Sequence, residues 1–227
     1  MAKSVRAPLA AACGCATALA LLAACVFGVD AVQRIDSDLL NAVMAPSGDA
    51  AGAGVYAVGR LADPVAVALL LALACGIALL RRRPIDAAAA VAVVAGANLT
   101  TTLLKHLFEV SRIQPVFITH EMLPAGIFPS GHATAAASIA IAFVAPRTSL
   151  PLAAGLGVIY VAAVDTAVLI LAWHYPSDIL AGTLVAAGWG FAVLAAVRAL
   201  QPADPELEPR EPPSGSASPA PPAVTPV

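Results

Sequence analysis

Apolar and polar stretches alternate along the chain in a pattern that predicts six membrane-spanning helices. The predicted spans are residues 8–28, 64–80, 86–104, 132–144 with their flanks, 150–173 and 179–200. A helix that crosses a bilayer needs about 20 apolar residues, so the stretch 64–80 is near the short limit. The pattern indicates an all-α, polytopic membrane protein built as a six-helix bundle.

The polar segments divide the chain into four parts. Residues 1–29 hold a basic lead and the first helix, residues 30–63 form a more acidic connection, and residues 64–200 form the membrane core. Residues 201–227 are rich in Pro, Ser, Ala and Glu and have no apolar period. We expect this last part to be a disordered tail.

The first two parts each allow two interpretations. A basic start before an apolar run is also typical of a secretory signal, and residues 22–25 resemble a lipoprotein cleavage box. We favour a retained helix because the run 8–28 is longer than the usual apolar core of a signal. In residues 30–63, an apolar face predicts a short amphipathic helix at the membrane surface, and an ordinary loop is the alternative. That face contains Ile35, Leu39, Leu40, Val43 and Met44.

Composition supports the membrane assignment. The chain has 227 residues, of which 60% are hydrophobic and 11% are charged, whereas soluble domains carry about 25% charged residues. The net charge of −2 without a basic face gives no reason to expect nucleic-acid binding. The four cysteines all lie inside apolar runs and lack partner ligands, so neither a disulfide nor a zinc site is indicated.

The basic residues predict how the chain is oriented. They fall at span ends that alternate onto one side, which should be cytoplasmic. This basic set is Lys3, Arg6, Arg81 to Arg83, Arg147 and Arg198. We therefore expect a multi-pass protein of the cell membrane with both termini inside and the connections 30–63, 105–130 and 173–178 outside.

Polar residues with chemical potential gather in three clusters on the outer side. In the first, Lys105 and Arg112 are seven residues apart and share a face if the third helix continues to Arg112. Two cations on one face suit an anion with several oxygens. The alternative is a pair of interfacial anchors, and Glu109 lies between them on the same face.

The second cluster is the string Phe128-Pro129-Ser130-Gly131-His132 at the entry to the fourth span. Ser130 can cap the helix, whose free backbone N–H groups and dipole favour an anion that approaches Gly131 closely. His132 adds a group that can carry a proton near neutral pH. The alternative is a capped helix start with a surface histidine.

The third cluster is the pair His174 and Asp178, at the start of the last span. A carboxylate one helical turn away can hold an imidazole in one tautomer and leave its other nitrogen free as nucleophile or base. A simple capped helix start is again the alternative. The neighbouring Trp173 and Tyr175 also suit an interfacial aromatic belt.

Together the three clusters predict a phosphate-transfer site. Two histidines, two cations and a helix N-terminus on one side of the membrane can bind a phosphate, attack phosphorus and protonate the leaving oxygen. No group of acids suited to a divalent metal stands out beside them in the sequence. We therefore prefer a route through a phosphohistidine and expect no metal or cofactor.

These residues resemble the type 2 phosphatidic acid phosphatases, relatives of the vanadium haloperoxidases. The resemblance covers roughly residues 60–200 and rests on three motifs. Lys105 and Arg112 match the first, residues 129–132 match the second in full, and His174 and Asp178 match the third. The resemblance implies that His174 is the nucleophile, Asp178 its orienting partner and His132 the general acid. It also implies a phosphate-binding set of Lys105, Arg112, Ser130 and Gly131.

The chain departs from the family motifs at two places. Ile113 stands where the first motif has Pro, and Ala167 and Val168 stand where the third has Ser-Arg. Loss of one charge-stabilising donor typically costs about 10²–10³ in rate. Arg60 at the outer end of the second span is a candidate replacement, and His106 and His120 are others that we interpret as loop histidines. Asp165, inside the fifth span, should face the bundle interior, and no role follows from its position.

The resemblance implies an enzyme that hydrolyses a phosphomonoester or diphosphate of a lipid at the extracytoplasmic face. Polyprenyl and phosphatidic acid-like lipids are the candidate substrates. A catalytically weakened member that binds lipid phosphate is the main alternative, because Ile113, Val168 and Glu109 depart from or interrupt the motif chemistry. A small transporter is a third, supported only by Asp165 and the polar residues near Asn98. The sequence sets no oligomeric state.

Overall fold

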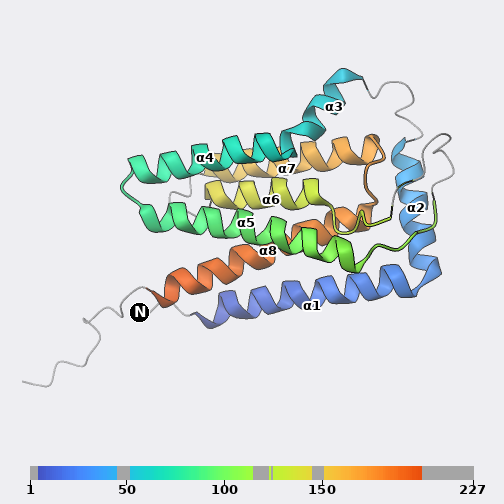
Figure 1. Cartoon of the computed structure of the whole chain (residues 1–227), viewed down its shortest axis with the longest axis horizontal. Coiled ribbons are helices and arrows are strands. Elements are labelled where there is room, and N and C mark those ends of the chain that lie inside the picture. The colour runs from blue at the N-terminus through green and yellow to red at the C-terminus, as the bar shows by residue number, and fades with distance from the viewer. Residues whose placement is uncertain (1–4, 45–51, 115–122, 124, 145–150, 201–227) are drawn as a thin grey trace, which may run out of the picture.

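A computed structural model describes residues 5–44, 52–114, 123, 125–144 and 151–200, and all of their regular structure is helical. In Figure 1 the helices other than α2 and α3 run along a common direction, and α2 crosses one end of them. The helices are α1 (Arg6–Gly28), α2 (Asp30–Met44), α3 (Ala53–Gly59), the 3-10 turn η2 (Arg60–Ala62), α4 (Pro64–Leu80), α5 (Pro84–Leu107), α6 (Gly131–Val144), α7 (Pro151–Ile170) and α8 (Pro176–Ala199).

Not every predicted span has the length of a full membrane crossing. Within the described residues, α1, α5, α7 and α8 are long and apolar enough to cross a bilayer. A fifth crossing forms if α3–η2 and α4 are taken together as one helix bent by 56°. The fourth predicted span is α6, which has 14 residues and is shorter than the usual 20 or so. The protein is thus an all-α, multi-pass membrane protein, with four or five full spans by length.

The short helix α6 lies at the centre of the bundle. It packs against α4, α5, α7 and α8, and five of its eight buried residues are alanines. Small side chains let four neighbouring helices approach closely, which is how helices associate where lipid removes the usual hydrophobic driving force. Its two buried polar side chains are Thr134, which donates to the Ser130 carbonyl just before the helix, and Ser138, which donates to the Ala135 carbonyl. Its contacts with these four helices fix their positions relative to one another.

The amphipathic helix predicted in the connection exists as α2, but its buried face is not the predicted one. Leu40 is buried as expected, whereas Ile35 is 59% exposed and Leu39 is 52% exposed. Asp36, Ser37 and Asn41 face inward instead. The reason is that Asp36 forms an ion pair with a buried arginine, and this contact sets the rotation of the helix.

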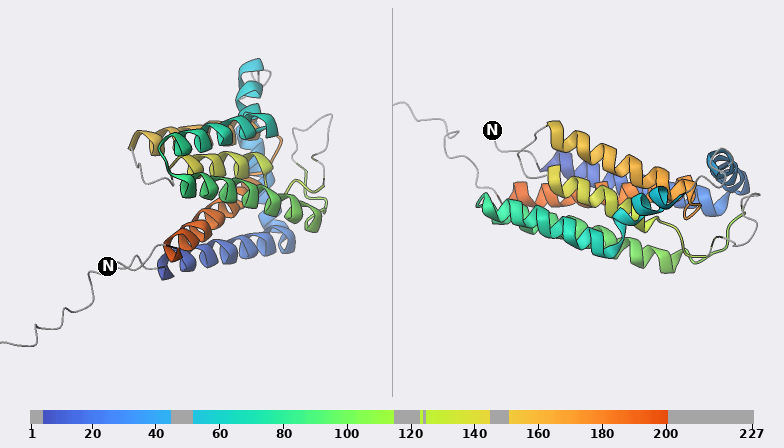
Figure 2. Two further views of the ribbon diagram at one scale, coloured as in Figure 1. Left: turned by 60° about the vertical axis from the view of Figure 1, so that its left-hand side comes forward. Right: turned by 90° about the horizontal axis from the view of Figure 1, so that it is seen from above.

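The described basic residues of the set predicted to be cytoplasmic lie at the opposite end of the bundle from the three motifs. The start of α1, the α4–α5 connection and the end of α8 lie together at one end in Figures 1 and 2, which places Arg6, residues 81–83 and Arg198 there. The other end carries α2, the segment after α5 and the starts of α6 and α8. This arrangement is what the charge pattern requires, and the side of the membrane remains a prediction. Lys3, Arg147 and the tail 201–227 lie outside the described residues.

Candidate active site

The second motif is a helix cap tied to the start of α8. The Ala133 N–H donates to the Ser130 Oγ at 3.2 Å, so Ser130 caps α6 as predicted. The Ser130 N–H donates to the Asp178 carbonyl at 2.9 Å, which joins the second and third motifs through the backbone. Gly131 opens the helix, and a Cβ placed on it would lie 3.9 Å from Cε of Lys105. The Lys105 side chain therefore lies beside the N-terminus of α6, where an anion is favoured.

A glycine on α8 makes this junction possible. A Cβ on Gly182 would lie 2.5 Å from the Ser130 carbonyl oxygen and 2.9 Å from the Thr134 hydroxyl. The Thr134 hydroxyl in turn lies 2.8 Å from the Thr101 hydroxyl on α5. Because only glycine permits such an approach, α5, α6 and α8 meet directly behind the motif loop.

The third motif places a histidine and a carboxylate together at the base of α8. His174 Nδ1 and Asp178 Oδ2 are 3.6 Å apart, and both side chains are buried. That Oδ2 atom also accepts the Tyr175 N–H at 2.9 Å, which closes a capping box on α8. Asp178 is therefore held rigidly beside one ring nitrogen of His174, and the other ring nitrogen is directed away from it.

The two motif histidines are neighbours. The rings of His132 and His174 have centroids 5.8 Å apart and meet edge to face. The Trp173 ring lies 5.1 Å from the His132 ring. The fold thus brings His132, His174, Ser130, Gly131 and Lys105 to one end of the bundle, as the motifs predicted.

Arg112 reaches the same end by a different path from the predicted one. The α5 helix ends at Leu107, and Arg112 lies in the non-helical segment that follows. The prediction that a continuing helix puts Lys105 and Arg112 on one face is therefore wrong. The segment turns inward, where Arg112 is buried and forms ion pairs with two acids from other elements.

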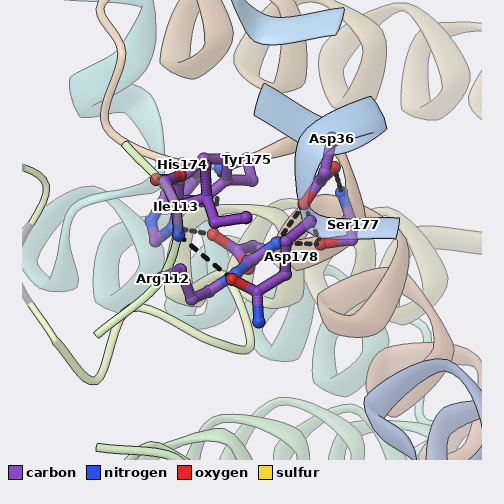
Figure 3. A network of polar contacts seen from close by, with 8 residues as sticks. Asp36, Arg112, Ile113, His174, Tyr175, Ser177 and Asp178 are labelled. Carbon is purple, nitrogen blue, oxygen red and sulfur yellow. Dashed lines mark hydrogen bonds and ion pairs between the residues drawn. The ribbon is translucent and has the colours of Figure 1, made fainter. Parts of the chain in front are cut away.

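The guanidinium of Arg112 is the centre of a buried polar network (Figure 3). Its Nη1 donates to Asp178 Oδ1 at 2.7 Å, and its Nη2 donates to Asp36 Oδ2 and to the Ser177 hydroxyl. Asp36 also accepts the Ser177 N–H at 2.9 Å and the Ser177 hydroxyl at 2.5 Å. Both terminal nitrogens of Arg112 are thus bound to carboxylates, and its role as a phosphate ligand stays a prediction.

The departure at Ile113 has a structural use. Its backbone N–H donates to the Gln33 side chain of α2 at 3.0 Å, a bond that proline cannot make. Its carbonyl accepts the Tyr175 hydroxyl at 2.8 Å. Tyr175 is therefore buried and joins the segment after α5 to the start of α8, and burial raises the pKa of its phenol to about 12. The motif position that lacks proline fastens α2 over the site.

Two carboxylates at the site were missed by sequence reasoning. Asp36 contacts Arg112 and Ser177, which follow it by 76 and 141 residues, so no local spacing announces it. Asp63, directly before Pro64, has Oδ1 3.5 Å from His132 Nε2. Its position at the start of α4 with Arg60 three residues earlier was the available signal.

The remaining predicted residues fall outside the polar network. Val168 is fully buried in the apolar core. Asp165 lines an apolar cavity of about 780 Å³ between α6, α7 and α8, and its Oδ1 has no hydrogen-bond partner among the described residues. His106 is exposed in the last turn of α5 and makes no hydrogen bond, ion pair or ring contact with the described part of the chain. His120 lies outside the described residues.

Comparison with known proteins places this arrangement in a family. The fold is similar to the crystal structure of the first transmembrane PAP2 type phosphatidylglycerolphosphate phosphatase from Bacillus subtilis, with a TM-score of 0.70 and 19% identity over 84% of this chain and 97% of that one. At this identity the likeness shows the fold. No curated protein sequence matches the chain. A sequence model of the PAP2 superfamily matches residues 86–202, more than half of the chain and all three motifs, so the chain belongs to the PAP2 superfamily.

Proposed function

We propose that the protein is a membrane lipid phosphatase that works through a phosphohistidine. The observation that carries this proposal is the adjacency of His132 and His174, 5.8 Å apart beside the N-terminus of α6. A helix N-terminus and Lys105 hold the phosphate oxygens, and one histidine on each side can serve attack and departure. Family membership and the phosphatase fold support the same reaction class.

The reaction has two displacements at phosphorus. The free ring nitrogen of His174 forms an N–P bond while the bond from phosphorus to the lipid oxygen breaks. Protonated His132 gives its proton to that oxygen, so the lipid leaves as an alcohol, or as a monophosphate when the substrate is a diphosphate. Water then attacks the phosphohistidine, His132 takes a proton from it, and inorganic phosphate leaves with His174 restored.

The environment supports a lipid as the substrate. The site lies at one end of a bundle whose helices match the bilayer, so a lipid can keep its chains in the membrane while its headgroup enters. Arg6, residues 81–83 and Arg198 lie at the opposite end, which favours an extracytoplasmic site by the positive-inside rule. Polyprenyl and phosphatidic acid-like phosphates or diphosphates are the substrate classes we propose.

The test is phosphate release from a panel of these lipids by the full-length protein in detergent with EDTA present. We expect release by the wild type and a loss of at least about 10⁴-fold in His174→Ala, because the nucleophile is gone. His106→Ala is the matched control, since that histidine is exposed at the same end of the bundle and should leave the rate unchanged. Release that EDTA abolishes would overturn the route through a phosphohistidine without metal.

A second function is favoured by the state of Arg112. With both terminal nitrogens bound to Asp178 and Asp36, and Val168 in place of the third-motif Arg, the site has fewer free cations than the motifs imply. A protein that binds lipid phosphate without hydrolysing it fits this arrangement. No release by the wild type from any lipid, with or without EDTA, together with retained binding of a lipid phosphate, would select this function.

A further inference from the structure

A segment that precedes the residues matched to the family is fixed against the two histidines. A Cβ on Gly59 would lie 3.0 Å from the Trp173 ring, and the Tyr56 ring meets the same indole edge to face at 5.5 Å. The Tyr160 hydroxyl of α7 donates to the Leu61 carbonyl at 2.9 Å. The segment formed by α3, η2 and Asp63 is thus held from both α7 and the turn that carries Trp173.

This anchoring delivers a carboxylate to His132. Asp63 Oδ1 lies 3.5 Å from His132 Nε2, and Asp63 Oδ2 accepts the Arg60 Nε–H at 2.7 Å. Arg60 uses only its Nε there, and its terminal nitrogens make no hydrogen bond with the described residues. Its side chain is 59% exposed, so a planar fork of N–H donors is open to an anion beside His132.

We propose that Asp63 is a positioning residue for His132 and that Arg60 supplies a phosphate-binding cation that the third motif lacks. The inference rests on the proposed phosphatase function. A carboxylate on one nitrogen of His132 fixes the ring and stabilises its positive charge, so that the other nitrogen can pass a proton to the leaving oxygen. The other titratable groups that act on this ring are His174 and Lys105. Neither Asp63 nor Arg60 falls within residues 86–202, so the family match does not assign them.

The role of Asp63 can be separated from a structural one by the leaving group. A lipid alcohol needs a proton in order to leave, whereas nitrophenolate leaves without one. In Asp63→Asn we expect kcat/KM to fall about 10–100-fold for dioctanoyl phosphatidic acid and less than about 3-fold for p-nitrophenyl phosphate. Asp63→Glu should recover part of the loss, because it restores the carboxylate. An equal loss on both substrates, or no loss on either, would overturn the positioning role.

The chain offers a matched control for this variant. Arg83 and Asp86 form another ion pair three residues apart at a helix start, at the opposite end of α5 from Lys105. Asp86→Asn should leave both rates unchanged. A wild type that releases no phosphate overturns the proposed function and this inference with it, whereas an active wild type with an unaffected Asp63→Asn overturns the inference alone.

Arg60 is tested by binding rather than by leaving-group chemistry. Arg60→Gln should raise KM for the lipid phosphate about 10-fold with a smaller change in kcat, and Arg60→Lys should lie between it and the wild type. An unchanged KM in Arg60→Gln would show that the guanidinium does not contact the phosphate.

Discussion

Two sets of contacting residues, each with a histidine, an aspartate and an arginine, meet at the same site. The two sets differ mainly in burial. In the first, the side chains of His174, Asp178 and Arg112 are 6%, 0% and 4% exposed. In the second, those of His132, Asp63 and Arg60 are 25%, 26% and 59% exposed. In the first set, Arg112 also contacts another buried acid, Asp36, whereas the second set ends at the solvent-exposed Arg60. The same residue types thus occur once as part of the core and once at its edge.

The difference fits the tasks that we propose for the two histidines. A nucleophile must hold one orientation toward phosphorus. Hydrogen bonds from Arg112 and from the Tyr175 N–H fix Asp178, whose Oδ2 lies 3.6 Å from His174 Nδ1. A general acid must regain its proton in every turnover, which requires access to water. Buried ion pairs also carry a large desolvation cost, which explains why Arg112 is matched by two acids and Arg60 by one.

The sharpest test of this contrast removes each arginine in turn. Arg112→Met leaves Asp178 and Asp36 buried without their cation, and we expect a loss of about 3–5 kcal/mol in stability. Arg60→Met removes an exposed partner and should leave the unfolding midpoint nearly unchanged. Thermal unfolding of both variants in the same detergent, followed by helical circular dichroism, measures the difference. Equal unfolding midpoints would show that the difference in burial between the two sets does not change what their arginines contribute to stability.

The sequence predicted the parts of the site that are local in the chain. The Ser130 cap follows from residues adjacent to it, and the His174–Asp178 contact follows from helical spacing. Most spans follow from apolar length, whereas α6 has 14 residues and packs against four other helices. The alternation of the spans and the family motifs also predicted that the three clusters meet at one end. The contacts of Asp36 and Asp63 were not predicted, because no periodicity or motif relates these acids to the residues that they meet after folding.

Two expectations from local pattern show how this limit works. A helix that continued to Arg112 would place this arginine on the same face as Lys105. The helix ends at Leu107 instead, and Arg112 binds two acids from other segments. The inward face of α2 was chosen by its apolar residues, but the ion pair of Asp36 outweighs them.

A smaller effect is expected at the contact between Gly182 and the Ser130 loop, which joins the two sets. Gly182→Ala places a Cβ 2.5 Å from the Ser130 carbonyl, so the motif loop must move, at a cost of about 1–3 kcal/mol. Because Ser130 precedes His132 by two residues, the phosphate-release rate should fall along with the unfolding midpoint. Gly188→Ala is the matched control on the same helix, since its Cβ would lie 3.5 Å from Cys15 in ordinary contact. A wild-type rate in Gly182→Ala would show that the loop position does not govern the site.

The smallest effect is expected at Tyr175, which contacts only the buried set that contains Arg112. Its ring lies 4.1 Å from the Arg112 guanidinium carbon, and its hydroxyl donates to Ile113. Tyr175→Phe should cost about 0.5–1.5 kcal/mol, the usual net value of one hydrogen bond.

Burial raises the pKa of the Tyr175 phenol to about 12 in the folded protein, whereas an unfolded tyrosine titrates at about pH 10. Between these values the unfolded state binds fewer protons, so this contribution to stability is complete below the unfolded pKa and declines as pH rises through the folded one. The phenylalanine variant lacks the ionisable group, so its disadvantage to the wild type should shrink across that interval when unfolding midpoints are measured in parallel. A disadvantage that stays constant with pH would mean that Tyr175 titrates alike in both states and is not buried as a neutral phenol beside Arg112.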